Sequence, residues 1–148
     1  MLKRIKPLIS IHDFQFGFRN KHSTIDQIHR VTKVIEKVFE EKKYCTAVLL
    51  DASQAFDRIW HEGLILKISK ALPQNYCQLL ESYLANRKFK VIREEANSSF
   101  YPIQAGVPQG IILGPLLCLL YTADIPTSDE TFIGTFADDT AVMAVDDS

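Results

Sequence analysis

The tetrapeptide Phe136-Ala137-Asp138-Asp139 stands between two apolar runs, residues 131–136 and residues 140–145. Because no long loop separates the runs, the pattern predicts a β-hairpin with Asp138 and Asp139 at or beside its turn. A tight turn breaks the strand alternation of side chains, and Asp tolerates the backbone angles found there. The two carboxylates can then converge, and a divalent cation would remove their repulsion. A solvated acidic turn is the alternative that the pair alone leaves open.

Composition bounds the class of protein. The 148 residues suffice for one domain with a core, and 47% hydrophobic with 24% charged residues is typical of a soluble globular protein. A net charge of -1 shows no global basic excess, although nucleic-acid binding needs only a local basic stripe. Cys45, Cys77 and Cys118 are predicted to be buried free thiols of a reducing, intracellular compartment. We expect neither a secretory signal nor a membrane span.

Asp51 directly follows a continuous apolar run over residues 44–50. Such a run suits a strand that is covered on both faces, and ligand sites often lie at the carboxyl ends of strands in mixed sheets. Residues 52–57 are predicted to turn into a short helix. A simple helix cap is therefore an equal alternative for the role of Asp51.

Apolar residues recur at helical spacing in four other segments. The first helix is predicted to begin at Thr24, because Thr24 and Gln27 have the spacing of a capping box. Two more helices are predicted over residues 62–72 and 75–85. A buried apolar helix is predicted to begin at Gly114-Pro115.

Two basic segments are candidates for contact with nucleic acid. Arg19 and Lys21 lie in a small cationic loop, for which a plain surface loop is the alternative. A predicted amphipathic strand turns at Ala96-Asn97 into a second strand over residues 98–104, and its basic residues are Arg87, Lys88, Lys90 and Arg93. A basic strand face can track a nucleic-acid backbone or protect an exposed sheet edge, and the sequence leaves both open.

Four motifs in this order and spacing resemble the reverse transcriptases of non-LTR retrotransposons, in particular the jockey-type elements of insects. They are Gln-Phe-Gly-Phe-Arg at residues 15–19, Val-Leu-Leu-Asp-Ala-Ser-Gln-Ala-Phe-Asp at 48–57, Ala-Gly-Val-Pro-Gln-Gly at 105–110 and Phe-Ala-Asp-Asp at 136–139. Any one motif is a weak signal, but the likeness extends from residue 15 to residue 145.

The resemblance implies an α+β fold, namely a polymerase palm with a ferredoxin-like β-α-β-β-α-β sheet, helices on one face, and partial fingers. Residues 1–148 would form a single reverse transcriptase domain fragment. About residues 1–43 and 86–105 would be fingers-like, and about residues 44–85 and 106–148 would belong to the palm. We expect the thumb, the later palm motifs and any endonuclease domain to be absent.

Individual roles also come from the resemblance. The catalytic, metal-binding carboxylates would be those of Asp51, Asp138 and Asp139, with the backbone carbonyl of Ala52 as a further ligand. The ring of Phe56 would lie beneath the sugar of the incoming nucleotide. The other nucleotide-site and template-site residues implied by the likeness are Gln109, Gly110 and Arg19.

The implied activity is RNA-directed DNA polymerisation, in which two Mg2+ ions, or Mn2+ as a substitute, serve nucleotidyl transfer onto a primer 3′-hydroxyl. The partners would be an RNA template, a DNA primer and deoxynucleoside triphosphates, with no membrane partner and no oligomeric state indicated. The location would be the nucleus or cytoplasm. A catalytically inactive transposon-derived fragment, or a nucleic-acid-binding module with the same fold, is the alternative. We expect the isolated 148 residues to be inactive.

Overall fold

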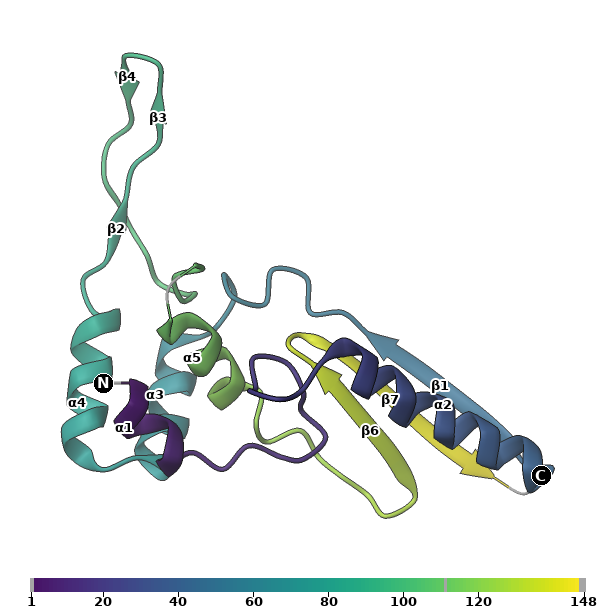
Figure 1. The fold of residues 1–148 in the computed structure, drawn as a ribbon. Helices are drawn as coiled ribbons and strands as arrows, with labels where there is room; N and C mark the ends of the chain where they lie inside the picture. Colours follow the sequence, from purple (N-terminus) through teal and green to yellow (C-terminus); the bar gives the residue numbers. More distant parts are fainter. Residues whose placement is uncertain (1, 111, 147–148) are drawn as a thin grey trace. The chain divides into compact units, whose positions relative to one another are not determined.

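The chain contains both helices and strands, as a computed structural model shows for residues 2–110 and 112–146 (Figure 1). In order, the elements are α1 (Leu2–Ile5), η1 (Lys6–Leu8), α2 (Thr24–Glu40), β1 (Tyr44–Leu50), α3 (His61–Ala71), α4 (Gln74–Leu84), β2 (Lys88–Phe89), β3 (Ile92–Arg93), β4 (Ala96–Asn97), β5 (Tyr101–Pro102), α5 (Leu113–Tyr121), β6 (Thr131–Phe136) and β7 (Asp139–Asp146). This mixture confirms the α+β class.

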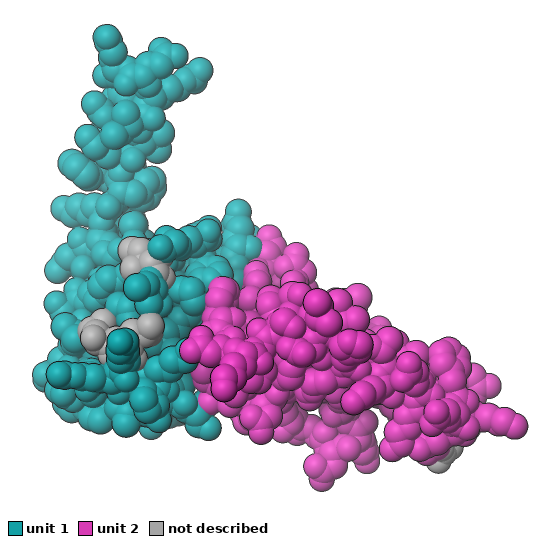
Figure 2. All heavy atoms as spheres, viewed as in Figure 1, with its two compact units in different colours: residues 1–10, 54–121 teal, residues 11–53, 122–148 magenta. Residues whose placement is uncertain are grey.

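The chain folds as two compact units, coloured in Figure 2. Unit 1 comprises residues 1–10 and 54–121, and unit 2 comprises residues 11–53 and 122–148. The limits of these units differ from those expected for fingers and palm, and that assignment stays a prediction.

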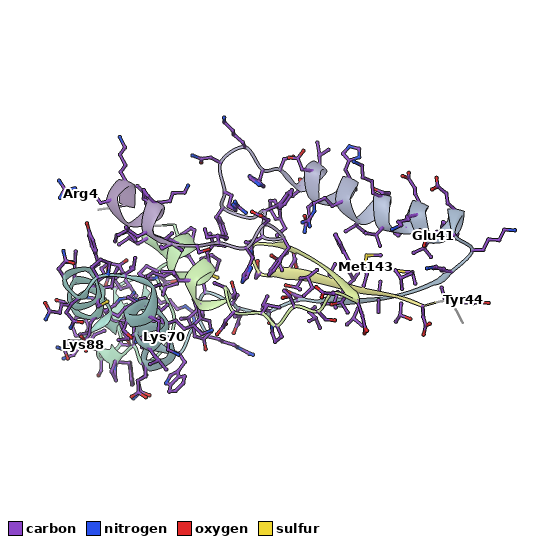
Figure 3. The ribbon with its side chains drawn as sticks, turned by 90° about the horizontal axis from the view of Figure 1, so that it is seen from below. Arg4, Glu41, Tyr44, Lys70, Lys88 and Met143 are labelled. Carbon is purple, nitrogen blue, oxygen red and sulfur yellow. The ribbon has the colours of Figure 1, made fainter. Side chains whose placement is uncertain are left out.

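Unit 2 is built on an antiparallel sheet with the strand order β1-β7-β6. Helix α2 lies along one face of this sheet, with Met143 between helix and sheet (Figure 3). Met143 is only 2% exposed, and Val38 of α2 and Ile133 of β6 are also buried. Because the described part of this sheet has three strands, the four-stranded ferredoxin-like arrangement stays a prediction.

Strand β1 has the predicted bounds but not the predicted burial. Leu49 is 81% exposed, and Val48 and Leu50 are about half exposed. Among the described residues β1 pairs with β7 alone, so it is an edge strand and the expectation of cover on both faces is wrong. Cys45 is accordingly half-buried, whereas the other two free thiols, Cys77 and Cys118, are buried as predicted.

Helix α2 begins at Thr24 as predicted, but its N-cap is Ser23. The Ser23 hydroxyl accepts a hydrogen bond from the Asp26 N–H at 3.2 Å, and the Asp26 carboxylate accepts one from the Ser23 N–H at 2.8 Å. The capping box therefore lies one residue earlier than predicted, because the backbone of Ser23 is extended while Thr24 is already helical. The Ser23 hydroxyl, which also donates to this carboxylate, is the main cause that lowers the pKa of Asp26.

Unit 1 is a small helical core with a long hairpin. Helices α3 and α4 meet at Pro73, and α5 packs on α3. Seven of the nine residues of α5 are buried, which agrees with the predicted apolar helix. Among the described residues, no helix combines the length and the apolarity that crossing a membrane requires.

The pairs β2–β5 and β3–β4 form one hairpin that extends away from the helices of unit 1 (Figure 1). Its turn is Glu94-Glu95, because Arg93 pairs with Ala96. The predicted turn at Ala96-Asn97 is therefore wrong. Glu94 adopts φ +54°, so the chain reverses before Ala96, and residues 96–97 pair as β4.

Candidate catalytic site

The pairing of β1 with β7 brings two of the predicted aspartates together. The last pair of this ladder is Leu50 with Thr140, so Asp51 and Asp139 are the residues that adjoin this pair at the same end of the ladder. Neighbouring strands lie about 4.8 Å apart, which is within reach of two short carboxylate side chains. Asp51 and Asp139 also line one pocket of about 280 Å3 beneath the end of the sheet. The structure thus joins residues that are far apart in the sequence.

The third aspartate, Asp138, lies in the turn between β6 and β7. Phe136 pairs with Asp139, which leaves Ala137 and Asp138 as a two-residue hairpin turn, as predicted. Ala137 has φ +60°, the sign that the first position of a type I′ or II′ turn requires. Asp138 is half-buried, and Asp139 and Asp51 are exposed, so solvent and ligands reach these carboxylates.

The segment Gln15-Phe16-Gly17 lies directly against this turn. Its backbone forms a parallel bridge with β6, in which the Phe16 N–H donates to Thr135 O at 2.9 Å. The Gln15 side chain continues the contact: its Nε2 donates to Ala137 O and its Oε1 accepts from Ala137 N, both at 3.1 Å. Sequence reasoning placed the motif of residues 15–19 near the template but assigned no role to Gln15.

Gly17 permits this close approach. A Cβ built on Gly17 would lie 2.0 Å from the Ala137 nitrogen and 2.6 Å from the Ala137 Cα. No side chain fits in that space, and the backbone atoms of Ala137 cannot move aside cheaply. Glycine is therefore required here for its size.

The buried polar side chains of the described residues gather around this contact. There are three, and they belong to Gln15, Gln27 and Thr135. The Phe14 carbonyl accepts from Gln27 Nε2 at 3.3 Å and from the Thr135 hydroxyl at 3.4 Å. Because a buried polar group is costly unless it is hydrogen-bonded, this network specifies how residues 14–17 lie on β6.

Arg30 closes the network from α2. Its Nη1 donates to Gln27 Oε1 at 3.1 Å, and its guanidinium lies 5.0 Å from the ring centroids of both Phe16 and Phe132. Burial of the guanidinium lowers the pKa of Arg30. The aromatic rings compensate part of that burial through cation–π attraction.

The predicted cationic residues of this loop have different surroundings. Arg19 Nη1 donates to the carbonyls of His12 and Gln15, each at 3.0 Å. Its guanidinium therefore stabilises the loop of residues 12–15. Lys21 is exposed and adopts φ +63°. Contact of either residue with template or nucleotide stays a prediction.

The whole chain, residues 1–148, matches the protein family described as "Reverse transcriptase (RNA-dependent DNA polymerase)". The chain belongs to this family. It is 46% identical over 139 residues to the "Probable RNA-directed DNA polymerase from transposon BS" of Drosophila melanogaster, a match that covers 88% of this chain and 15% of that protein.

Two further relatives agree. Identity is 47% over 135 residues with the "Probable RNA-directed DNA polymerase from transposon X-element" of Drosophila melanogaster, covering 88% of this chain and 15% of the relative. Identity is 43% over 142 residues with the "RNA-directed DNA polymerase from mobile element jockey" of Drosophila funebris, covering 90% and 16%. The predicted resemblance to reverse transcriptases of jockey and related non-LTR elements is confirmed. The chain spans about 15% of the length of these relatives.

Unit 1 of this reverse transcriptase domain holds Phe56, Gln109 and Gly110, whereas Arg19 belongs to unit 2. The loop of residues 105–110 packs on the segment that contains Phe56: Val107 N donates to Phe56 O and Gly106 N donates to Ile59 O, each at 2.8 Å. His61 Nε2 donates to Gly106 O at 2.7 Å. Backbone hydrogen bonds thus join the segment that contains Phe56 to the loop of residues 105–110 within unit 1.

An open pocket of about 610 Å3 lies beside that loop. Gln109 lines it together with Arg87 and Phe89 from the base of the long hairpin. Gln109 and the adjacent Gly110 are exposed, as are Lys88 and Lys90 on the hairpin. A cationic, aromatic and amide lining of this kind can receive a base and its phosphate.

In residues 2–110 and 112–146, no three His, Cys, Asp or Glu side chains gather closely enough to hold an ion by themselves. Asp51 and Asp139 line one pocket, and with Asp138 and the exposed residue Ala52 adjacent in sequence they offer hard oxygen donors. Mg2+ is commonly held by one or two carboxylates plus substrate phosphates, so this donor set fits Mg2+.

Proposed function

We propose that this chain is the metal-binding core of an RNA-directed DNA polymerase of a non-LTR retrotransposon. It would extend a DNA primer on an RNA template with deoxynucleoside triphosphates. The observation that carries the proposal is the register of β1 and β7 in a chain of this family: Asp51 and Asp139 adjoin its last pair, Leu50 with Thr140, beside the Asp138 turn.

Asp51, Asp138, Asp139 and the carbonyl of Ala52 would hold two Mg2+ ions, for which Mn2+ can substitute. When bound, these ions supply activation of the primer hydroxyl and stabilisation of the leaving pyrophosphate. The part of the protein is to fix the carboxylates on paired strands, so that their geometry exists before substrate arrives. This suits phosphoryl transfer, which needs positioning and charge neutralisation more than a side-chain nucleophile.

Unit 1 would position the other reactants. The proposed role of Phe56 is to lie beneath the deoxyribose, and that of Gln109 and Gly110 is to line the site of the nucleotide and template base. Arg87, which lines the same pocket as Gln109, and the exposed Lys88 and Lys90 would contact phosphates. Arg19 and Lys21 would contribute on the template side.

The finer architecture is part of the proposal. Unit 2 would belong to a ferredoxin-like palm, which is supported by the adjacency of β1 to the β6–β7 hairpin. Partial fingers would come from about residues 1–43 and 86–105. The enzyme would act in the nucleus or cytoplasm.

The test is primer extension on an RNA template by the full-length protein with Asp138→Asn. Loss of a ligand charge should reduce turnover at least about a hundredfold with the fold intact by circular dichroism. Asp129→Asn is the matched control, because it removes the same charge from an exposed loop residue of unit 2 and should leave turnover unchanged. Near-normal extension by Asp138→Asn, or no RNA-templated synthesis by the wild-type protein, would overturn the proposal; the latter would favour the inactive-fragment alternative.

A further inference from the structure

We infer that Gln15 is a positioning residue for the catalytic aspartates, acting through the Ala137 peptide. The inference rests on the proposed function, because it concerns how Asp138 and Asp139 are held. Its physical content is separate: one side-chain amide selects one conformation of the turn on which both carboxylates are mounted.

The Gln15 side chain forms a bracket around Ala137, by which we mean that it bonds both backbone groups of that residue. The Gln15 amide donates to the Ala137 carbonyl and accepts from the Ala137 N–H, so it satisfies both backbone groups of that residue. The same Oε1 also accepts from Gly17 N at 2.7 Å. Gln15 is only 6% exposed, so water cannot easily replace these bonds.

The turn needs such support because Ala137 is left-handed without being glycine. Its φ of +60° is a conformation that L residues with a side chain rarely adopt. Turns with other backbone angles would be open to the sequence Ala137-Asp138, and each would aim the two carboxylates differently. The bracket stabilises the one conformation in which both Ala137 groups face Gln15.

A glutamine suits this position better than its near neighbours in chemistry. Its amide carries both a donor and an acceptor, whereas a glutamate carries acceptors only and a methionine has no comparable donor. Gln15→Glu would place a carboxylate beside the Ala137 carbonyl and near two aspartates. Gln15→Met keeps the length and removes both bonds, so the two substitutions separate charge from hydrogen bonding.

The experiment uses hydrogen–deuterium exchange of the full-length protein in the absence of Mg2+, together with primer extension. Gln15→Met should accelerate exchange of the peptide that contains Ala137, whose N–H loses its acceptor. It should also lower the turnover number by about ten- to a hundredfold, as for residues that orient metal ligands, and raise the Mg2+ concentration that gives half-maximal activity. The KM for deoxynucleotides should change little, because Gln15 touches the turn and not the pocket of Gln109.

Thr135→Val is the matched control. It removes a buried hydroxyl that bonds Phe14 O in the same network and leaves the Ala137 bonds intact. It should leave both exchange at Ala137 and the Mg2+ requirement unchanged. If Gln15→Met fails to fold, Gln15→Glu takes its place. A glutamate loses the donor to Ala137 O but keeps an acceptor for the Ala137 N–H, so its expected result is the rise in Mg2+ requirement without faster exchange at that N–H.

Two outcomes would overturn the inference. One is unchanged exchange at Ala137 in Gln15→Met, or an unchanged Mg2+ requirement in Gln15→Glu where that variant takes its place. The other is the same loss of turnover and the same Mg2+ requirement in Gln15→Met and Thr135→Val, which would mean a purely structural role. Failure of the proposed function is distinguishable, because Asp138→Asn would then leave synthesis unaffected while the exchange measurement on Gln15 still gives its own answer.

Discussion

The molecule contains two hairpin turns of similar form in very different surroundings. Ala137-Asp138 joins β6 to β7, and Glu94-Glu95 joins β3 to β4. Each has two central residues, and in each the first is a non-glycine residue at positive φ, +60° for Ala137 and +54° for Glu94. The two turns therefore share the same length and the same left-handed first residue.

What differs is the support from outside the hairpin. The Ala137 peptide is hydrogen-bonded by Gln15 and closely approached by the backbone of Gly17, and both residues lie more than a hundred positions earlier in the chain. The Glu94 turn closes a ladder of two residue pairs, and its strands are exposed. A strained, left-handed backbone conformation that tertiary contacts hold in place is characteristic of functional sites. We therefore expect the Ala137-Asp138 turn to need a fixed conformation, whereas the Glu94-Glu95 turn need only reverse the chain.

The largest expected effect comes from removing the close approach. Gly17→Ala would place a methyl group against the Ala137 backbone, so the segment of residues 15–17 must move off the turn. We expect a loss of about 3 kcal/mol in the free energy of unfolding, at the upper end of overpacking costs. Glu95→Ala at the other turn should change it by less than about 0.5 kcal/mol. Urea titration of both variants measures the difference, and equal stabilities would show that Gly17 is not required.

Replacing the first residue of each turn by glycine tests the same comparison of the two turns. Glycine adopts positive φ without strain, so Glu94→Gly and Ala137→Gly should each stabilise their turns by up to about 1 kcal/mol. At Ala137, however, glycine also admits other turn conformations, and we expect primer extension to fall roughly fivefold because the aspartates are positioned less well. Glu94→Gly should leave extension unchanged. Equal activity of the two variants would mean that the turn conformation does not limit catalysis.

The sequence allowed the elements to be predicted where local signals agree. Residues 44–50 form β1 with the predicted bounds, because a continuous apolar run of that length has few alternatives. The Asp-Asp hairpin was predictable for a similar reason: two apolar runs flank only three residues, 137–139. The N-cap was placed one residue late because Ser23 and Thr24 are both cap formers, with Asp26 and Gln27 each three residues further on.

Other features depend on contacts that the sequence does not display. A left-handed Glu94 is uncommon, so the pair Glu94-Glu95 carries little turn signal, and Ala96-Asn97 carries the stronger one because Asn is common in turns. Whether β1 is central or at an edge depends on partners distant in the chain. The bond from Gln15 to Ala137 spans 122 residues, and only the unusual amide among aromatic and glycine neighbours could have pointed to it.

The smallest expected effect lies at the start of α2. This helix carries Gln27, which bonds the Phe14 carbonyl and so belongs to the contacts that support the Ala137-Asp138 turn. Ser23→Ala removes the hydroxyl that caps the helix and donates to Asp26. At pH 7 we expect the Tm to fall by about 3 °C, the usual cost of a lost N-cap in a chain of this size.

The pH dependence identifies the cause of that fall. The Ser23 bonds lower the pKa of Asp26 below its ordinary value of 3.8, so the carboxylate form is favoured in the folded state. This contribution is present above pH 3.8 and is lost as the pH falls through the lowered, folded-state pKa. The gap in Tm between wild type and Ser23→Ala should therefore narrow on acidification through that range, as thermal melts followed by circular dichroism would measure. A gap that stays constant down to the lowest pH at which both proteins fold would assign the effect to the bond between the Ser23 hydroxyl and the Asp26 N–H, which does not titrate.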